Sequence, residues 1–472
     1  MRNRIDPRAP RSTPSARHDP HPRARRAFRA VTLAALGALA ACAVLPEGLD
    51  AERERAAAAS ADYATPYPER ALPELPPAPE LLPLWARTLR AHGELESAWH
   101  AWQARLDAVT RAASFPNTNV ELSAEHALPM EGRSAWDRTT LRAGFDPMQS
   151  LWGRGKLAAA GEAALAEARV AGERFRARRA ELKRALVEAW IEWLAAREEA
   201  RLVADALELE QLAVASRDAR AGGGGEVALL VEARIAAGRA RDEAARADVR
   251  DATRLAALNA LLARAPDAPL EPPAAWPRRE LALSLDALQT LAAERDPVRA
   301  ERRAETDARE RELVLARKEG RPDVAPMLGV VGSLETFVGA SLSLPLNRQR
   351  VRALVAEARS ALRAAEADAR QAERDRRAAL ATAHRVFEDA ERARALFADE
   401  LLPLAARACD DAEAACAVLG SSTDEWIEVR RMQIEVRRVE LEARVARELA
   451  LAEIEEGLGT DLEGLAEETN HE

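Results

Sequence analysis

Residues 324–351, VAPMLGVVGSLETFVGASLSLPLNRQRV, change their periodicity within a short length of chain. Within the run from Phe337 to Leu344, apolar side chains alternate at 338, 340, 342 and 344, and the link 332–336 separates this run from a similar one at 324–331. Alternation with period two predicts strands, so the two runs form a β-hairpin. From Asn347 onwards the apolar residues recur every three or four positions, which predicts a helix.

The same order of patterns occurs earlier in the chain. Val120, Leu122 and Ala124 alternate with polar residues, and a second alternating run, 139–145, follows a polar loop. A helical pattern then runs from about 149 to 220, as it does from 347 to 419 after the second hairpin. Each pattern covers about 70 residues, so each helix is a rod on the order of 105 Å long.

Further helices flank each long one. A helical segment precedes each hairpin, at about 84–113 and 285–320, and a return helix follows each long helix after a break. Apolar residues at spacings of three and four predict coiled-coil seams. The seam of the first long helix comprises Leu182, Leu186, Ala189, Trp193, Ala196, Ala200, Val203 and Leu207. The seam of the second return helix comprises Val429, Met432, Val436, Val439, Ala443, Ala446 and Ala450.

Two Pro-rich stretches divide the chain into a tandem repeat, which we call the first and second repeats. Ala185-Leu186 in the first repeat corresponds to Ala379-Leu380 in the second. The fold class is therefore mainly α with a small β part. The predicted organisation is a signal peptide (1–41), a Pro-rich linker (42–83), the first repeat (84–265), a Pro-rich linker (266–283), the second repeat (284–459) and a C-terminal tail (460–472).

The first 41 residues form a targeting segment, in which an Arg-rich stretch precedes an apolar run too short to span a bilayer. Its end, Leu39-Ala40-Ala41-Cys42, resembles the lipobox of bacterial lipoproteins, which implies a lipid on Cys42. A plain signal peptide that ends near a cysteine is the alternative. The formal net charge is -9, and removal of this basic segment makes the chain more acidic, which argues against a nucleic-acid partner.

Two hairpins per chain cannot close a barrel, and unpaired strand edges are unfavourable in lipid. The chain must therefore oligomerise. Three copies would supply twelve strands, a number within the range of outer-membrane barrels.

The order of these elements behind a lipobox resembles the TolC family of outer-membrane efflux proteins over essentially the whole mature chain. The strand entries FPNTNVELS (115–123) and RPDV (321–324), the strand exit SLSLPL (341–346) and the helix proline in Leu402-Pro403-Leu404 carry the resemblance. It implies a homotrimer with a 12-stranded β-barrel in the outer membrane on an α-helical barrel in the periplasm. The partners would be a periplasmic adaptor protein and an inner-membrane pump. The first strand entry also resembles the heavy-metal CzcC/CusC-like branch.

Enzyme signatures are absent from the sequence, so we expect no catalytic residue and no cofactor. The run 222–225 lacks the Lys-Ser/Thr of a phosphate-binding loop and follows a helix rather than a strand. The histidines lack metal-ligand spacing. Cys409 and Cys416 lie seven residues apart on one predicted helix, roughly 10 Å, which is too far for a disulfide.

The two breaks between long and return helices are the candidate site, because they should form the periplasmic tip that meets the adaptor. The residues are Gly222, Gly223, Gly224, Gly225, Val227, Gly420 and Ser421. Asp410 and Asp411 precede the second break and could form an acidic ring at the channel entrance, where the field would favour cations. The alternative is that Asp410 and Asp411 are solvent-facing charges without a function.

Two other functions compete with the channel. A periplasmic adaptor lipoprotein of an efflux pump also carries a helical hairpin. Such an adaptor, however, has a single helical hairpin and β-rich domains, which this sequence does not match. A structural coiled-coil lipoprotein of the envelope would not need the strand pairs. The sequence does not reveal the transported substrate.

Overall fold

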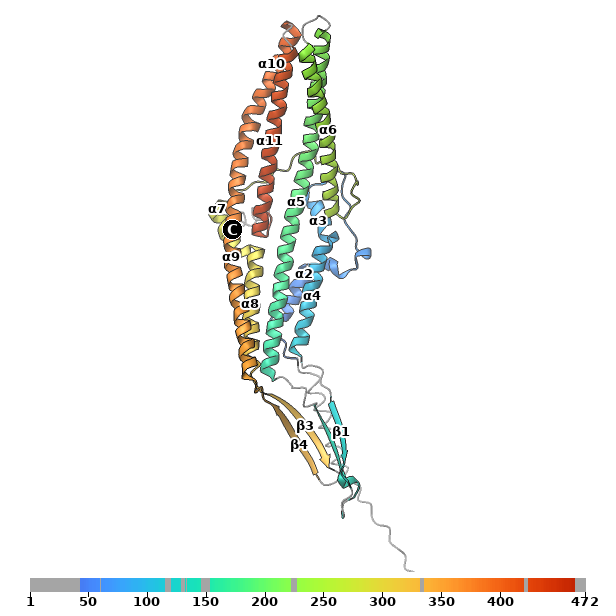
Figure 1. Ribbon diagram of the computed structural model, residues 1–472, viewed down its shortest axis with the longest axis vertical. Coiled ribbons are helices and arrows are strands. Elements are labelled where there is room, and N and C mark those ends of the chain that lie inside the picture. Colours follow the sequence, from blue (N-terminus) through green and yellow to red (C-terminus); the bar gives the residue numbers. More distant parts are fainter. Residues whose placement is uncertain are drawn as a thin grey trace, which may run out of the picture.

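The computed structural model describes residues 43–59, 61–114, 120–128, 132, 134–145, 153–221, 227–331, 335–419 and 423–462. The chain is mainly helical, and its four strands lie together at one end of an elongated molecule (Figure 1). The predicted signal peptide and Cys42 lie outside the described residues. Among those residues, no helix contains a stretch both long and apolar enough to cross a bilayer.

Each repeat follows the predicted order. The first contains α3 (Leu81–Ala91), α4 (Gly93–Ala113), β1 (Val120–His126), β2 (Thr139–Phe145), α5 (Arg154–Ala221) and α6 (Val227–Leu261). The second contains α7 (Leu285–Arg295), α8 (Pro297–Lys318), β3 (Asp323–Val331), β4 (Glu335–Ser343), α9 (Arg348–Ala395), α10 (Leu402–Leu419) and α11 (Thr423–Leu458). The structure therefore has the predicted tandem arrangement.

The single helix predicted before each hairpin is in fact two helices. His92 has extended backbone angles between α3 and α4. In the second repeat, the Asp296 side chain accepts hydrogen bonds from the backbone N–H groups of Val298 and Arg299, and Pro297 begins α8. An acceptor before the helix and a proline at its first position both favour a helix start, so the continuous periodicity conceals a break.

The second long helix is interrupted where the sequence places Pro403. A π-helical turn, η4 (Leu396–Leu401), joins α9 to α10, and the Leu402 N–H donates to the Phe397 carbonyl five residues back. Pro403 has no N–H to continue the ladder, so the wider turn accommodates the missing hydrogen bond. In contrast, α5 runs through 68 residues without a break.

Along the long axis of the molecule the helices lie at two levels, one next to the sheet and one at the far tip, and we call these levels layers. In the layer next to the sheet the order is α4, α5, α8, α9, and in the layer that ends at the far tip it is α6, α5, α11, α10 (Figure 1). The long helix α5 therefore contacts the second repeat in both layers, through α8 and α11.

The four strands form one antiparallel sheet in the order β1-β2-β3-β4. The register pairs Val120 with Phe145 and Ala124 with Leu141, so the predicted apolar faces of β1 and β2 coincide. Pairing of β2 with β3 joins the two repeats.

The predicted seams fare differently. On α5, Leu182, Leu186 and Trp193 are buried, as predicted. On α11, Ala443 and Ala450 are buried as predicted, but Met432 is 61% exposed, and a second buried row, Ile427, Ile434 and Leu441, faces α5. The α11 helix contacts several neighbours, so more than one of its faces carries apolar residues and spacing alone does not identify the buried one.

The Pro-rich segment before the first repeat packs on the helices. It contains α2 (Leu49–Ala59) and two 3-10 turns, η1 (Ala61–Ala64) and η2 (Tyr67–Glu69). Leu49, Ala56 and Tyr63 are buried in the same core as Trp102 of α4. Because this core includes α2, the segment is part of the folded body.

Candidate functional site at the tip and the sheet

The predicted tip residues Gly222–Gly225, Gly420 and Ser421 lie outside the described residues. Their neighbours nevertheless locate both breaks. The C-terminal ends of α5 and α10 and the N-terminal ends of α6 and α11 lie at the end of the molecule opposite the sheet (Figure 1). Val227, the first residue of α6, is 67% exposed there. The helix ends that flank the two breaks therefore lie at one tip.

Ion pairs join the two repeats close to this tip. Arg220 at the end of α5 contacts Asp424 at the start of α11, with Nη1 and Oδ2 2.8 Å apart. Arg217 also approaches Asp424, with Nε and Oδ1 3.6 Å apart. These contacts could not be predicted from the sequence, because the partners lie in different repeats and nothing in either local pattern relates them.

A stronger pair lies further from the tip, between Glu210 of α5 and Arg431 of α11. Arg431 donates from Nε and Nη2 to the two carboxylate oxygens of Glu210, both at 2.8 Å. This hydrogen bonding to Glu210 raises the pKa of Arg431. A bidentate pair of this kind fixes orientation as well as distance, so it sets how α11 lies against α5.

Asp410 and Asp411 are both exposed on α10. Asp410 lines a groove together with Asp205 and Glu208 of α5 and Glu413 of α10, beside Trp426 and Arg430 of α11. The structure thus brings Asp410 together with carboxylates of the first repeat, which sequence reasoning did not find. Asp411 does not line this groove. In the part of the chain that the structure describes, no group of three or more His, Cys, Asp or Glu could hold a metal ion.

The sheet has two chemically different faces. The register places Leu141, Val324, Val338 and Leu342 on one face, and these side chains are 41%, 47%, 82% and 58% exposed. The opposite face carries the polar residues Ser123, Glu125, Thr140, Arg142 and Ser343, together with the half-buried Phe337 and Val331. There Arg142 and Glu125 form an ion pair, with Nη1 and Oε1 3.4 Å apart. Among the strand side chains that the structure describes, the large apolar ones that are exposed all lie on the first face.

Both helical layers and the sheet have two unlike open edges. Within the described chain, β1 and β4 each pair with one strand only, and the outermost helices are α4 and α9 in one layer and α6 and α10 in the other. Apolar side chains are exposed on these edge helices, namely Val227, Val231 and Ile235 on α6, Val386 on α9 and Leu404 on α10. The edge strands and the edge helices are thus the parts of the described chain with a free side, and each of these three helices exposes apolar side chains there.

No protein-family model and no curated protein matches the sequence. Solved structures do match. A membrane protein from Pseudomonas aeruginosa is 19% identical, with a TM-score of 0.66 over 82% of this chain and 96% of that one. CusC, whose structures concern transmembrane channel formation, is 17% identical, with a TM-score of 0.63 over 80% of this chain and 92% of that one. The MtrE outer-membrane channel of Neisseria gonorrhoeae is 16% identical, with a TM-score of 0.63 over 81% and 89%.

The chain has the fold of TolC-type outer-membrane channels. The resemblance predicted from the order of the elements is thus confirmed at the level of the fold. The TolC-type structures match with TM-scores between 0.61 and 0.66, so their similarity does not single out the heavy-metal branch.

Proposed function

We propose that this chain is the outer-membrane channel of a tripartite efflux pump, the exit duct that passes small substrates from the periplasm to the exterior. The observation that carries the proposal is the sheet with one apolar, exposed face and one polar face. Neither an adaptor nor a structural coiled-coil lipoprotein needs such a sheet.

The apolar face suits a wall between lipid and water. Strands of a membrane barrel alternate between lipid-facing apolar residues and lumen-facing polar residues. Here Leu141 and Val338 would face lipid, while Thr140 and the Arg142–Glu125 pair would face the lumen. Strands β3 and β4 have nine residues each, about 30 Å of extended chain and close to the thickness of the hydrocarbon core.

The unlike edges favour closure into a ring. A contact between two different edges is head-to-tail, and repetition of such a contact closes a cycle when the rotation fits. Three copies would give a 12-stranded barrel from the sheets and a continuous helical wall from the two layers. The same closure would cover the exposed apolar residues of α6, α9 and α10. We therefore propose a homotrimer.

The position of the N-terminal segment supports a lipid anchor at Cys42. The Val44 N–H donates to the carbonyl of Ala113, the last residue of α4, at 2.9 Å. This segment also lies against Gly161 of α5, where a Cβ would stand 3.4 Å from the Val44 carbonyl oxygen. Since α4 leads directly into the hairpin, Val44 lies at the end of α4 nearest the sheet, and Cys42 is two residues before it in the sequence. A lipid there would enter the same membrane surface as the barrel.

The tip is the proposed contact with the periplasmic adaptor, which would connect the channel to the inner-membrane pump. The proposed docking residues are Gly222 to Gly225, Val227, Gly420 and Ser421, and Asp410 with Asp411 would contribute acidic charge at the entrance. The exposure of Val227 and the position of the flanking helix ends at one end of the molecule support this assignment.

The sheet is tested by a pair of adjacent substitutions. Leu141→Arg places a charge on the apolar face, which costs about 2–4 kcal/mol at the middle of a bilayer, while Thr140→Arg places the same charge on the polar face. We expect heat-modifiable trimers in the outer membrane to fall strongly for Leu141→Arg and to persist for Thr140→Arg. Equal trimer levels in the two variants would contradict a bilayer wall.

The tip is tested separately. Val227→Asp and Gly420→Trp should leave the trimer intact, because the barrel lies on the order of 100 Å away along the helices. Efflux-dependent resistance should fall, since the adaptor could no longer dock. Unchanged resistance in both variants with normal trimer levels would show that the adaptor docks elsewhere.

A further inference from the structure

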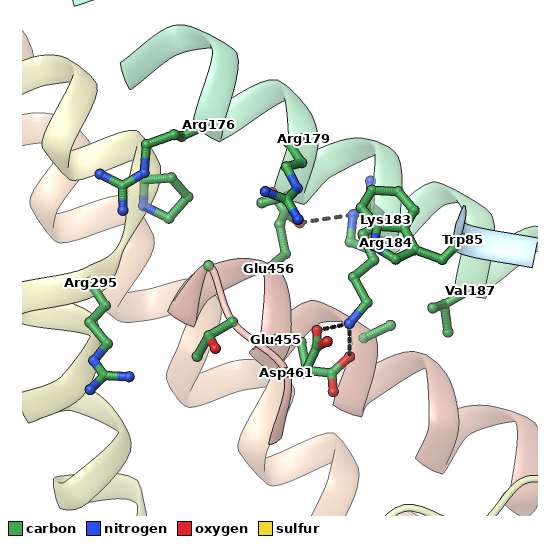
Figure 2. Close-up of a pocket in the computed structure, with 15 residues that line it drawn as sticks. Trp85, Arg176, Arg179, Lys183, Arg184, Val187, Arg295, Glu455, Glu456 and Asp461 are labelled. Carbon is green, nitrogen blue, oxygen red and sulfur yellow. Dashed lines mark ion pairs between the residues drawn. The ribbon is translucent and has the colours of Figure 1, made fainter. Parts of the chain in front are cut away.

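A pocket of about 220 Å³ lies where the first repeat meets the second, between the sheet and the tip (Figure 2). One wall is α5, from Arg176 to Val187, with Trp85 of α3 beside it. The other wall is formed by the corner between α7 and α8, at Arg295 and Pro297, and by the end of α11. A ligand in this pocket would touch both repeats.

The pocket lining is predominantly basic. Five cationic side chains line it, against three carboxylates: Arg176, Arg179, Lys183, Arg184 and Arg295 against Glu455, Glu456 and Asp461. Such a surplus within a confined space creates a positive potential that attracts anions.

The three carboxylates are already paired. Glu455 accepts a hydrogen bond from Arg279 at 2.7 Å and lies 3.9 Å from the Lys183 ammonium. Glu456 contacts Arg184 at 2.8 Å and Arg376 at 3.5 Å. Asp461 pairs with Lys183, as the dashed lines in Figure 2 mark. These carboxylates therefore have little capacity left to neutralise further cations.

Arg179 on the α5 wall supplies charge that no described carboxylate neutralises, because it is exposed and has no ion-pair partner among the described residues. Among these residues Arg176 pairs with Glu173 at 2.9 Å. Glu173 also contacts Arg55 at 2.8 Å, and Arg55 has a second partner in Glu52 at 2.9 Å. Arg176 and Arg179 are three residues apart on α5, and both line the pocket (Figure 2).

We propose that this pocket binds a small multivalent oxyanion, with Arg176 and Arg179 as its principal donors. Guanidinium groups present parallel N–H donors that match the oxygens of phosphate and carboxylate groups in bidentate fashion. The pocket volume corresponds to roughly seven water molecules, which suits an anion the size of phosphate, diphosphate or a small polycarboxylate.

The bound anion stabilises the contact between the repeats. Its oxygens lie on the α5 wall, and its other side faces the α7–α8 corner. A ligand that binds only the folded state increases the free energy of unfolding. Once its concentration exceeds the dissociation constant, this increase grows with the logarithm of the ligand concentration. The midpoint of thermal unfolding therefore rises as the anion concentration rises.

The chain itself offers a competing occupant. Asp461 already lies in the pocket, and the sequence continues beyond Leu462 with Glu463, Glu467, Glu468 and Glu472. If these carboxylates filled the basic pocket, an external anion would be excluded while they carried charge. The test below separates the two occupants.

The experiment uses the mature full-length protein in detergent at constant ionic strength. Inorganic phosphate, diphosphate and citrate are titrated separately against a chloride reference, and binding is followed by calorimetry and by thermal unfolding. We expect saturable binding, and the preferred anion distinguishes phosphate from carboxylate recognition. Arg179→Gln should weaken binding about tenfold, the effect of one lost hydrogen bond to a charged group. Arg176→Gln should act in the same direction.

Arg105→Gln is the matched control, because Arg105 is exposed on α4, lies outside the pocket and has no ion pair among the described residues. It should leave the affinity unchanged. Equal weakening in the control would overturn the proposal in favour of general charge screening, as would a lack of saturable binding to any of the three anions. Binding that appears only when Glu463, Glu467, Glu468 and Glu472 are all changed to Gln would identify the chain's own tail as the occupant and also overturn it.

Discussion

The two repeats share one topology but differ in what their interiors contain. The first repeat packs around large aromatic side chains, and Trp102, Phe175, Trp190 and Trp193 are all buried in one cluster. The second repeat has a smaller apolar cluster that includes Phe387, and beside it α11 carries buried ion pairs. The same topology therefore accommodates buried charge in one repeat and large aromatic side chains in the other.

The ionic cluster centres on Arg279 in the segment before α7. Its Nε and Nη1 donate to Glu448 and Glu455 of α11 at 3.0 and 2.7 Å, and Nη2 donates to the Glu448 carbonyl at 3.0 Å. The side chains of Arg279, Glu448 and Glu455 are 8%, 2% and 6% exposed. Charges this deeply buried are stable only while each keeps its partners.

The largest effect is expected from Trp102→Ala. The indole donates from Nε1 to Glu52 at 3.1 Å and packs so closely on Gly172 that a Cβ there would stand 2.8 Å from the ring. Loss of the ring should lower the free energy of unfolding by about 3–5 kcal/mol, with little dependence on salt. Unfolding of the purified protein in denaturant measures the change. Trp136→Ala, at a half-exposed position, is the control and should cost far less.

Arg279→Met should cost about 3 kcal/mol, because it leaves Glu448 and Glu455 buried with fewer partners. The double variant Arg279→Met, Glu448→Leu should recover part of that loss, since it also removes one of the buried carboxylates that had lost its partner. The same denaturation measurement applies. Arg246→Met breaks an exposed pair with Asp242, with side chains 66% and 62% exposed, and should change stability by less than about 1 kcal/mol. A loss for Arg279→Met no larger than this control would contradict a stabilising role for the buried ion pairs of Arg279.

The smallest effect concerns pH and the N-terminal segment. The hydrogen bond from Arg70 holds the pKa of Glu96 below its ordinary value of 4.5. A carboxylate with a depressed folded-state pKa adds stability above its unfolded pKa, and this contribution is lost as pH falls through the folded value. Arg70→Met should therefore remove about 1 kcal/mol at neutral pH and flatten the acid limb of the stability profile. If the loss of stability at low pH were the same in the variant and the parent protein, the Arg70–Glu96 pair would not contribute to the pH dependence of stability.

The parts of the fold that depend on local pattern could be predicted, and the parts that depend on neighbours could not. The hairpins and the long helices follow from periodicity and length. The breaks at His92 and Asp296 were missed because the apolar spacing continues across them. The α11 seam was partly wrong, as Met432 shows, because spacing does not reveal which neighbour each face meets.

The same limit applies to the candidate site. The two breaks could be placed at one tip from the equal lengths of the long helices. The Arg220–Asp424 pair and the approach of Asp205 to Asp410 could not be predicted, because each joins residues about 200 positions apart. Only the lateral packing of α11 between α5 and α10 brings them together.

The hydrogen bond from Val44 to Ala113 has a consequence for assembly. If Cys42 is lipidated as proposed, the tether between lipid and folded body is only two residues long. Each newly anchored chain would then stand at one fixed height, with its sheet edges level with those of its neighbours. Encounters would occur by lateral diffusion in a plane among chains that already share an orientation, which removes most of the search that three chains free in solution would have to make.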